Sequence, residues 1–426
     1  MKKLLSNILL ILVLMAHHGY AAEDESWGDD WGDDKWEEES PHSSNYEVLY
    51  SYGHLLDSNS VNIENYTLNE LRFDTEYQYK TTGFTFKFEA ELFVDQLTDE
   101  SEVVLDELSL YVPVSGGTDI KVGRQVVTWG TADLLFLNDL FVKDWKSFFN
   151  GREDTDLKDP VDAIRLSHYG DLFNVDFAYV PDFEADKVMT GERYSFYIPG
   201  FGIVQPQPEL NPVKQDEPEF AARIFANSDG TEWAFYMYEG FYKSPSKFLP
   251  DGTMTYAEMR SYGASIRTNV AGGLFNAEWS HYKSLEDEAG TNPFINNSQS
   301  RILIGYETEL VTNLTIGLQA YLEKTEDYSQ LVANLFPGQI ASDENRTMTT
   351  MRLTHQALQQ KLLNSLMIFY SPSDKDHYLR YSSQYKFDDR WKLIAGVNLL
   401  DGKYDYTFLS QLKDNSNVFF RIHYSF

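Results

Sequence analysis

The sequence predicts an all-β protein, a transmembrane antiparallel β-barrel of about 18 strands, with about 16 as the alternative count. Three observations support this fold class. Apolar and polar residues alternate along many segments of about ten residues. Short and long connections between these segments follow one another in turn. The chain also ends inside an alternating segment, NVFFRIHYSF, whose last residue is the aromatic Phe426.

The first residues predict export from the cytoplasm. Residues 1–3 (MKK) are basic, residues 8–16 are apolar, and residues 19–21 (GYA) fit a small-x-small cleavage site. The apolar stretch is too short to cross a bilayer. We therefore expect residues 1–21 to be a signal peptide, with an N-terminal anchor as the alternative. The chain has no cysteine, which excludes disulfides and a cysteine-linked lipid anchor.

Residues 22–44 are strongly acidic, and we expect them to form a disordered periplasmic tail. Residues 23–39 hold ten carboxylates and one lysine, a local charge of −9 within a chain total of −31. Like charges repel one another and oppose folding of such a segment. Trp27, Trp31 and Trp36 are either incidental, or they dock a periplasmic partner or the inside of the chain's own barrel. The acidic total argues against nucleic-acid binding, which needs a basic face.

Residues 45–426 are predicted to form the barrel. Along residues 84–95, apolar side chains occupy the even positions and mostly polar ones the odd positions. Similar segments predict strands at 45–56, 67–80, 84–97, 102–114, 118–129, 161–169, 172–182, 219–227, 231–243, 255–269, 273–284, 299–311, 314–325, 346–358, 362–371, 377–387, 391–401 and 417–426.

The connections indicate the two ends of the barrel. After even-numbered segments they are tight turns such as SGGT, SDG and TN, whereas after odd-numbered segments they are longer, above all at 130–160 and 183–218. Transmembrane barrels have short periplasmic turns and long outer loops, and an even strand count brings both termini to the periplasm. A soluble secreted sandwich or propeller is the alternative, but its connections would be of similar length at both ends.

The last segment explains why the chain ends on an aromatic residue. Val418, Phe420 and Ile422 suit lipid, while Arg421 and His423 suit a watery interior. The last strand must pair with the first, because no open sheet edge is stable in hydrocarbon. A terminal aromatic residue after alternating apolar residues resembles the signal read by the bacterial barrel-assembly machinery. We therefore expect that machinery and outer-membrane lipid as partners, and the outer membrane of a Gram-negative bacterium as the location.

One motif resembles a known family. The segment GRQVVTWG (residues 123–130) is followed by a long connection and then by LKDPVDAIRLSHYG. This arrangement is similar to that of alginate-export-like outer-membrane channels and of related proteins with a GRQxxxWG segment. The resemblance implies a Gram-negative channel of about 16 to 18 strands. It does not imply alginate as the solute.

The inward faces of the predicted strands carry opposite charges on different parts of the wall. Such charges either pair along the wall, or the arginines form a row that guides anions, since guanidinium groups bind carboxylates with paired donors. Opposed rows would create a transverse field in the lumen. The arginines are Arg165, Arg223, Arg267, Arg301, Arg352, Arg380 and Arg421, and the carboxylates are Asp74, Glu76, Glu89, Glu91 and Glu107.

The long connection at 131–159 is too apolar to be fully solvated. It contains Trp145, Phe148 and Phe149, followed by Arg152. Either it folds inward as a constriction, with a helical turn around residues 139–149, or it packs on the outer rim. The connection at 184–218 is rich in proline and is expected to be an extracellular cap.

The functional hypothesis is a porin-like channel for polar, anionic solutes. The alternative is a partner-dependent export conduit, in which the acidic tail docks a periplasmic or inner-membrane component. The sequence has no GxSxG segment and no pair of histidines at zinc-ligand spacing. We therefore expect no catalytic site, metal or cofactor.

Overall fold

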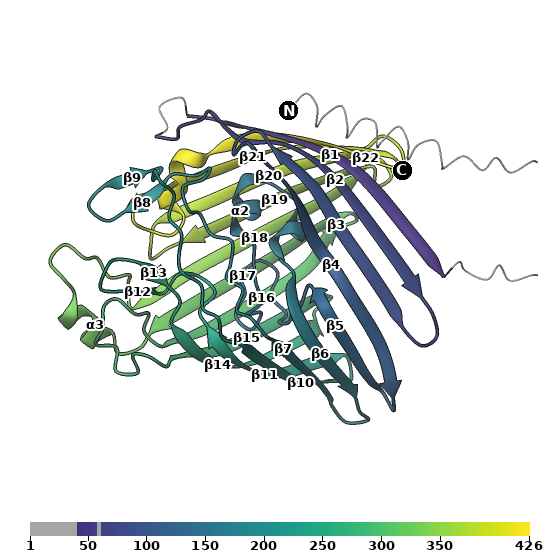
Figure 1. The fold of residues 1–426 in the computed structure, drawn as a ribbon, viewed down its shortest axis with the longest axis horizontal. Helices are drawn as coiled ribbons and strands as arrows, with labels where there is room; N and C mark the ends of the chain where they lie inside the picture. Colours follow the sequence, from purple (N-terminus) through teal and green to yellow (C-terminus); the bar gives the residue numbers. More distant parts are fainter. Residues whose placement is uncertain (1–40, 58–60) are drawn as a thin grey trace, which may run out of the picture. The chain divides into compact units, whose positions relative to one another are not determined.

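The computed structural model describes residues 41–57 and 61–426. The expected signal peptide and Trp27, Trp31 and Trp36 lie outside the described residues, so their roles stay predictions. From Pro41 onward the chain forms a closed antiparallel barrel of 18 strands (Figure 1). Each barrel strand pairs with the next along the chain, and the last strand returns to the first. The predicted fold class and strand count are confirmed.

The barrel strands account for most of the described residues. In chain order they are β1 (His42–Leu55), β2 (Tyr66–Lys80), β3 (Thr85–Asp95), β4 (Glu100–Ser115), β5 (Thr118–Gln125), β6 (Val161–Tyr169), β7 (Asn174–Val180), β10 (Glu219–Ser228), β11 (Thr231–Phe241), β14 (Glu258–Val270), β15 (Gly273–Ser284), β16 (Gln299–Val311), β17 (Leu314–Thr325), β18 (Asn345–Ala357), β19 (Leu362–Ser371), β20 (Asp376–Lys386), β21 (Trp391–Gly402) and β22 (Asn417–Ser425).

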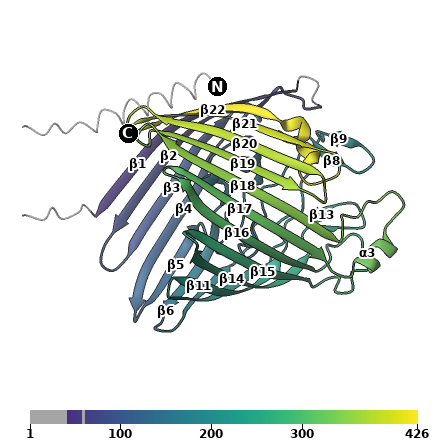
Figure 2. The ribbon, with the colours of Figure 1, turned by 180° about the vertical axis from the view of Figure 1, so that it is seen from behind.

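Short elements lie in the long connections. Two small hairpins pair β8 with β9 and β12 with β13. Figures 1 and 2 show these hairpins and α3 at the end of the barrel opposite Phe426. No helix among the described residues is long and apolar enough to span a bilayer. The short elements are β8 (Phe196–Ile198), β9 (Gly202–Val204), β12 (Lys247–Phe248), β13 (Met254–Thr255), α2 (Trp145–Asn150), α3 (Tyr328–Asn334), η1 (Asp154–Leu157) and η2 (Ser410–Asn415).

Strand alternation separates a lipid-facing surface from the interior. On β16, Ile302 and Ile304 are exposed on the outer face, while Leu303 between them is fully buried inside. Successive side chains of a strand point to opposite faces, so one strand serves both surroundings. The outer apolar face suits hydrocarbon, and the closed hydrogen-bonded wall leaves no free edge within it.

The first and last strands form the closing seam. β1 pairs with β22 from Glu47↔Ser425 to Leu55↔Asn417. At the end of the seam, the Phe426 backbone N–H donates to the Tyr46 carbonyl at 3.0 Å. The Tyr46 and Phe426 rings stack with centroids 5.8 Å apart. Phe426 therefore adds one backbone hydrogen bond and one ring contact to the closing seam.

Most predicted strand boundaries lie within a few residues of the observed ones, and two of the differences change the interpretation of the chain. β1 begins at His42, within the segment assigned to the tail. The strand expected at 118–129 ends at Gln125, because the chain then leaves the wall. Val127 and Trp129 are buried in the interior instead, where they join an apolar cluster. The GRQVVTWG segment therefore spans the point at which the wall gives way to an inward loop.

Candidate channel lumen and its inner loop

Residues 126–160, here called the inner loop, cross the interior of the barrel. Near its start, the buried Glu278 of β15 accepts a hydrogen bond from the Ala132 N–H at 2.9 Å and another from the Asn138 amide at 2.8 Å. Farther along, Arg152 binds Glu70 of β2. These contacts join the loop to distant parts of the wall, so it does not lie on the outer rim.

Apolar packing fixes the loop on one side of the interior. Val127, Trp129, Phe141 and Val142 belong to a buried cluster with side chains of β6, β7, β10, β11, β14 and β15. Burial of each large apolar side chain contributes about 1.5–3 kcal/mol. This first cluster holds the beginning of the loop against one stretch of the wall.

The sequence-predicted aromatic residues lie in a second buried cluster. Phe148 and Phe149, from α2 and beside Trp145, pack against Phe369 of β19 and Tyr378 of β20. The Asp144 side chain caps α2 by accepting from the Ser147 N–H at 2.8 Å. The helical turn expected around residues 139–149 therefore falls at Trp145–Asn150 and faces the wall formed by β18–β21.

A buried network of charges ties the loop to β2. Glu70 is fully buried and pairs with Arg152 from the loop and with Arg193 at 3.0 Å. Arg193 also binds Asp95 of β3 at 2.5 Å. Arg193 comes from residues 181–218, here called the arm. Residues 184–218, which make up most of the arm, are predicted to be an extracellular cap, and Arg193 among them helps to hold the inner loop through Glu70.

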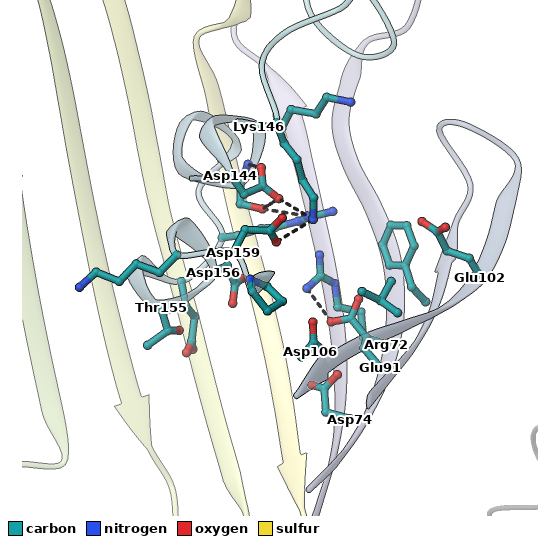
Figure 3. A pocket seen from close by; sticks show the side chains of 18 of the residues that line it. Arg72, Asp74, Glu91, Glu102, Asp106, Asp144, Lys146, Thr155, Asp156 and Asp159 are labelled. Carbon is teal, nitrogen blue, oxygen red and sulfur yellow. Dashed lines mark hydrogen bonds and ion pairs between the residues drawn. The ribbon is translucent and has the colours of Figure 1, made fainter. Parts of the chain in front are cut away.

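A cavity with a volume of about 780 Å³ lies between the inner loop and β1–β4. Neither of the two loop clusters includes a described residue of β1–β4. Figure 3 shows Asp74, Glu91 and Asp106 on the wall side, with Asp156 and Asp159 on the loop side. The lining residues comprise fourteen carboxylates and six Lys or Arg, an excess of eight carboxylates. The cavity is therefore strongly negative.

Some of these carboxylates have partners. Arg72 Nη1 lies 2.8 Å from Glu91 Oε2, and Lys121 Nζ lies 2.6 Å from Glu107 Oε1. On the loop, burial raises the pKa of Asp159, although Lys187 donates a hydrogen bond to it at 2.8 Å. As the pH falls, Asp159 on the loop side of the cavity is therefore protonated at a higher pH than a solvent-exposed aspartate.

A bulge adds charge to β4. Glu89 of β3 faces Glu107, whereas the next residue, Ala90, faces Leu105. Asp106 is therefore the extra residue, and both it and Glu107 line the cavity. A bulge breaks the strict alternation that places neighbours on opposite faces. Sequence alternation consequently identified Glu107 and missed Asp106.

The other predicted acidic residues follow the strand pattern. Asp74, Glu89, Glu91 and Glu107 all line the cavity. Glu76 does not line it. Sequence analysis missed several other lining carboxylates, because some lie beyond the bulge and others on the inner loop and the arm. They include Glu100, Glu102, Asp156, Asp159, Glu192 and Glu209.

Five of the seven predicted arginines pair with carboxylates. The partners come from neighbouring strands or from the inner loop, so the row is largely neutralised. Of the alternatives drawn from the sequence, pairing along the wall therefore describes most of the row. The pairs are Arg165–Asp176 (3.1 Å), Arg223–Asp176 (2.5 Å), Arg301–Glu323 (3.3 Å), Arg352–Asp133 (2.8 Å), Arg352–Asp154 (2.9 Å) and Arg380–Asp154 (3.1 Å).

The remaining two arginines have no ion pair among the described residues. Arg267 is exposed on the wall of a cavity of about 320 Å³. Arg421 is 3% exposed and lines a third cavity of about 240 Å³. Within the described part of the chain, no group of three or more His, Asp or Glu is arranged to hold a metal ion.

Comparison with known proteins identifies the class of the fold. No protein-family model and no curated protein matches the sequence. The closed barrel has the fold of Gram-negative outer-membrane β-barrel channels, and its apolar outer face suits the hydrocarbon of a bilayer.

Solved structures with this fold share little sequence with the chain. OccAB3 of Acinetobacter baumannii matches with a TM-score of 0.55 and 10% identity over 90% of this chain and 99% of its own. OccD3 (OpdP) of Pseudomonas aeruginosa matches with a TM-score of 0.54 and 10% identity over 90% and 91%. These likenesses establish the fold alone, and none shows the alginate-export-like family.

Proposed function

We propose that the protein is a porin-like channel through which polar solutes cross the outer membrane. The observation that carries this proposal is the polar cavity of about 780 Å³ between the inner loop and β1–β4. Barrels of this size enclose a lumen, and inward loops restrict it. The inner loop packs against the wall from β6 to β15 and from β18 to β21, which leaves the β1–β4 side for passage.

The charge of that side favours cations or solutes with a cationic group. An excess of eight carboxylates attracts positive charge, and the low-dielectric wall strengthens the attraction. The sequence alone favoured anionic solutes because of the arginine row. Since five of those arginines are paired, anions become the second candidate, supported by the unpaired Arg267 and Arg421.

The test is the reversal potential of single channels in planar bilayers under a KCl gradient, with the chain starting at residue 22. We expect a potential of the sign that K⁺ permeation produces. Glu91→Gln combined with Asp106→Asn should move it toward zero. Glu239→Gln is the matched control, because Glu239 pairs with Arg260 at 2.8 Å on the outer face. A potential of the opposite sign would favour anions, and a lack of conductance would contradict the channel.

A further inference from the structure

Arg421 is a buried guanidinium group that forms no ion pair with any described residue, and the charge of Glu153 acts on it only from beyond ion-pair distance. It lies on the inner face of β22, and its Nε and Nη1 atoms have no hydrogen-bond partner. Glu153, an inner-loop carboxylate lining the same cavity, is held by Lys392 at 3.0 Å. An unpaired buried charge is costly. The site is therefore electrostatically incomplete.

The cavity in front of Arg421 offers further donors. Thr354, Ser365 and Ser382 project into it from β18, β19 and β20, together with the amide of Gln384. None of these four side chains forms a hydrogen bond with another described residue. Hydroxyl and amide groups beside an arginine are suited to the oxygens of an anion.

The same cavity already holds one tethered carboxylate. Asp154, from the inner loop, lies 2.9 Å from Arg352 Nη1 and 3.1 Å from Arg380 Nη1. These two arginines are thus satisfied by a carboxylate that the chain supplies. Arg421 is the third arginine of the cavity and lacks one.

We propose that this cavity binds a small oxyanion, a carboxylate or a phosphate, through Arg421. The volume of about 240 Å³ is below the range of about 300–1,000 Å³ typical of drug-sized ligands, so the anion is small. Its role as a station along the transport path rests on the proposed channel function. The wider acidic cavity still determines the overall ion preference.

The binding test uses thermal unfolding of the chain from residue 22 onward in detergent. Sodium acetate and sodium phosphate are compared with sodium chloride at equal ionic strength. Either oxyanion should raise the midpoint of the wild type, because a ligand that binds the folded state stabilises it. The oxyanion with the larger effect identifies the ligand chemistry.

Three variants test the location of the site. Arg421→Gln should abolish the rise, and without the oxyanion it should be at least as stable as the wild type, because a buried unpaired charge is gone. Arg267→Gln, at the other unpaired member of the seven predicted lumen arginines, should keep the rise. Arg421→Lys covers the case in which the glutamine variant does not fold. It should weaken binding about tenfold, because paired donors are lost while the charge remains.

The outcomes separate this proposal from the channel. No rise in the wild type, a rise retained in Arg421→Gln, or a rise lost equally in Arg267→Gln would overturn the site. Conductance is measured on the same samples. Protein that conducts without an oxyanion-dependent shift lacks the site, whereas protein that shows the shift without conducting retains the site and is not a channel.

Discussion

Arg152 of the inner loop donates two hydrogen bonds to Glu70 of β2, with an Nε–Oε2 distance of 3.1 Å. Glu70 is fully buried, and it also binds Arg72 and Arg193. The contact fastens the loop to the wall beside the acidic cavity, whereas both apolar clusters lie on other parts of the wall. We therefore expect the width of the proposed passage to depend on this ion pair.

Replacement of Arg152 by Ala should destabilise the barrel and widen the passage. Loss of the only partner of a buried charge costs about 3–5 kcal/mol, and the cost here should be smaller because Arg72 and Arg193 still pair with Glu70. We expect a lower free energy of unfolding in detergent and a larger single-channel conductance. Arg260→Ala, which breaks a pair on the outer face, is the control and should change both quantities little. Unchanged conductance in Arg152→Ala would show that the loop does not limit the passage.

Deletion of Asp106 should be tolerated and should weaken the proposed preference for cations. Because Asp106 is the extra residue of the bulge, its removal restores regular pairing between β3 and β4. Deletion of Leu110, a regularly paired residue of β4, is the control. It shifts the following side chains to the opposite face and should prevent folding. Folding yield and reversal potential are the measurements, and equal yields would contradict the assignment of the bulge.

Acid should loosen the tip of the inner loop through Glu153. Burial alone would raise the pKa of Glu153, but the positive charges of Lys392, Arg421 and His423 bring it below its ordinary value of 4.5. The group therefore contributes stability above pH 4.5, and this contribution is lost as pH falls through the lowered pKa.

In the partly exposed pair with Lys392 the effect is at most about 1 kcal/mol. The measurement is thermal stability as a function of pH for the wild type and Glu153→Gln. The variant should have a smaller loss of stability in acid. Identical dependence of thermal stability on pH in the two proteins would show that Glu153 does not cause the loss of stability in acid.

The outer face of β16 should not tolerate a charge. Ile304 is 51% exposed there, at the middle of the strand. Ile304→Lys should lower the free energy of unfolding by about 2–4 kcal/mol, because that is the cost of a lysine that faces lipid near the bilayer centre. Glu307→Lys, on the inner face of the same strand, is the matched control and should mainly alter ion preference. The measurement is the free energy of unfolding of both variants in lipid vesicles. Equal stabilities of the two variants would show that both residues face water.

The strand pattern could be predicted from the sequence because alternate side chains of each strand face lipid and the lumen, and these two surroundings favour apolar and polar residues, respectively. On β22, Phe420 and Ile422 are exposed and Arg421 is buried, as their positions indicated. The bulge at Asp106 could not be predicted in this way, because one added residue changes no local composition. The Arg380–Asp154 pair joins residues 226 positions apart, so it depends on the path of the inner loop rather than on any local pattern.

The negative wall is largely independent of the residues that hold the inner loop. Glu100, Glu102 and Asp106 line the cavity, and none of them pairs with a described residue of the loop or the arm. In the proposed channel, the residues that hold the fold and those that set the ion preference are therefore largely separate. Substitutions along β4 should therefore change which solutes pass without disturbing the packing of the inner loop. Homologous chains that diverge at these positions would transport different solutes through the same barrel.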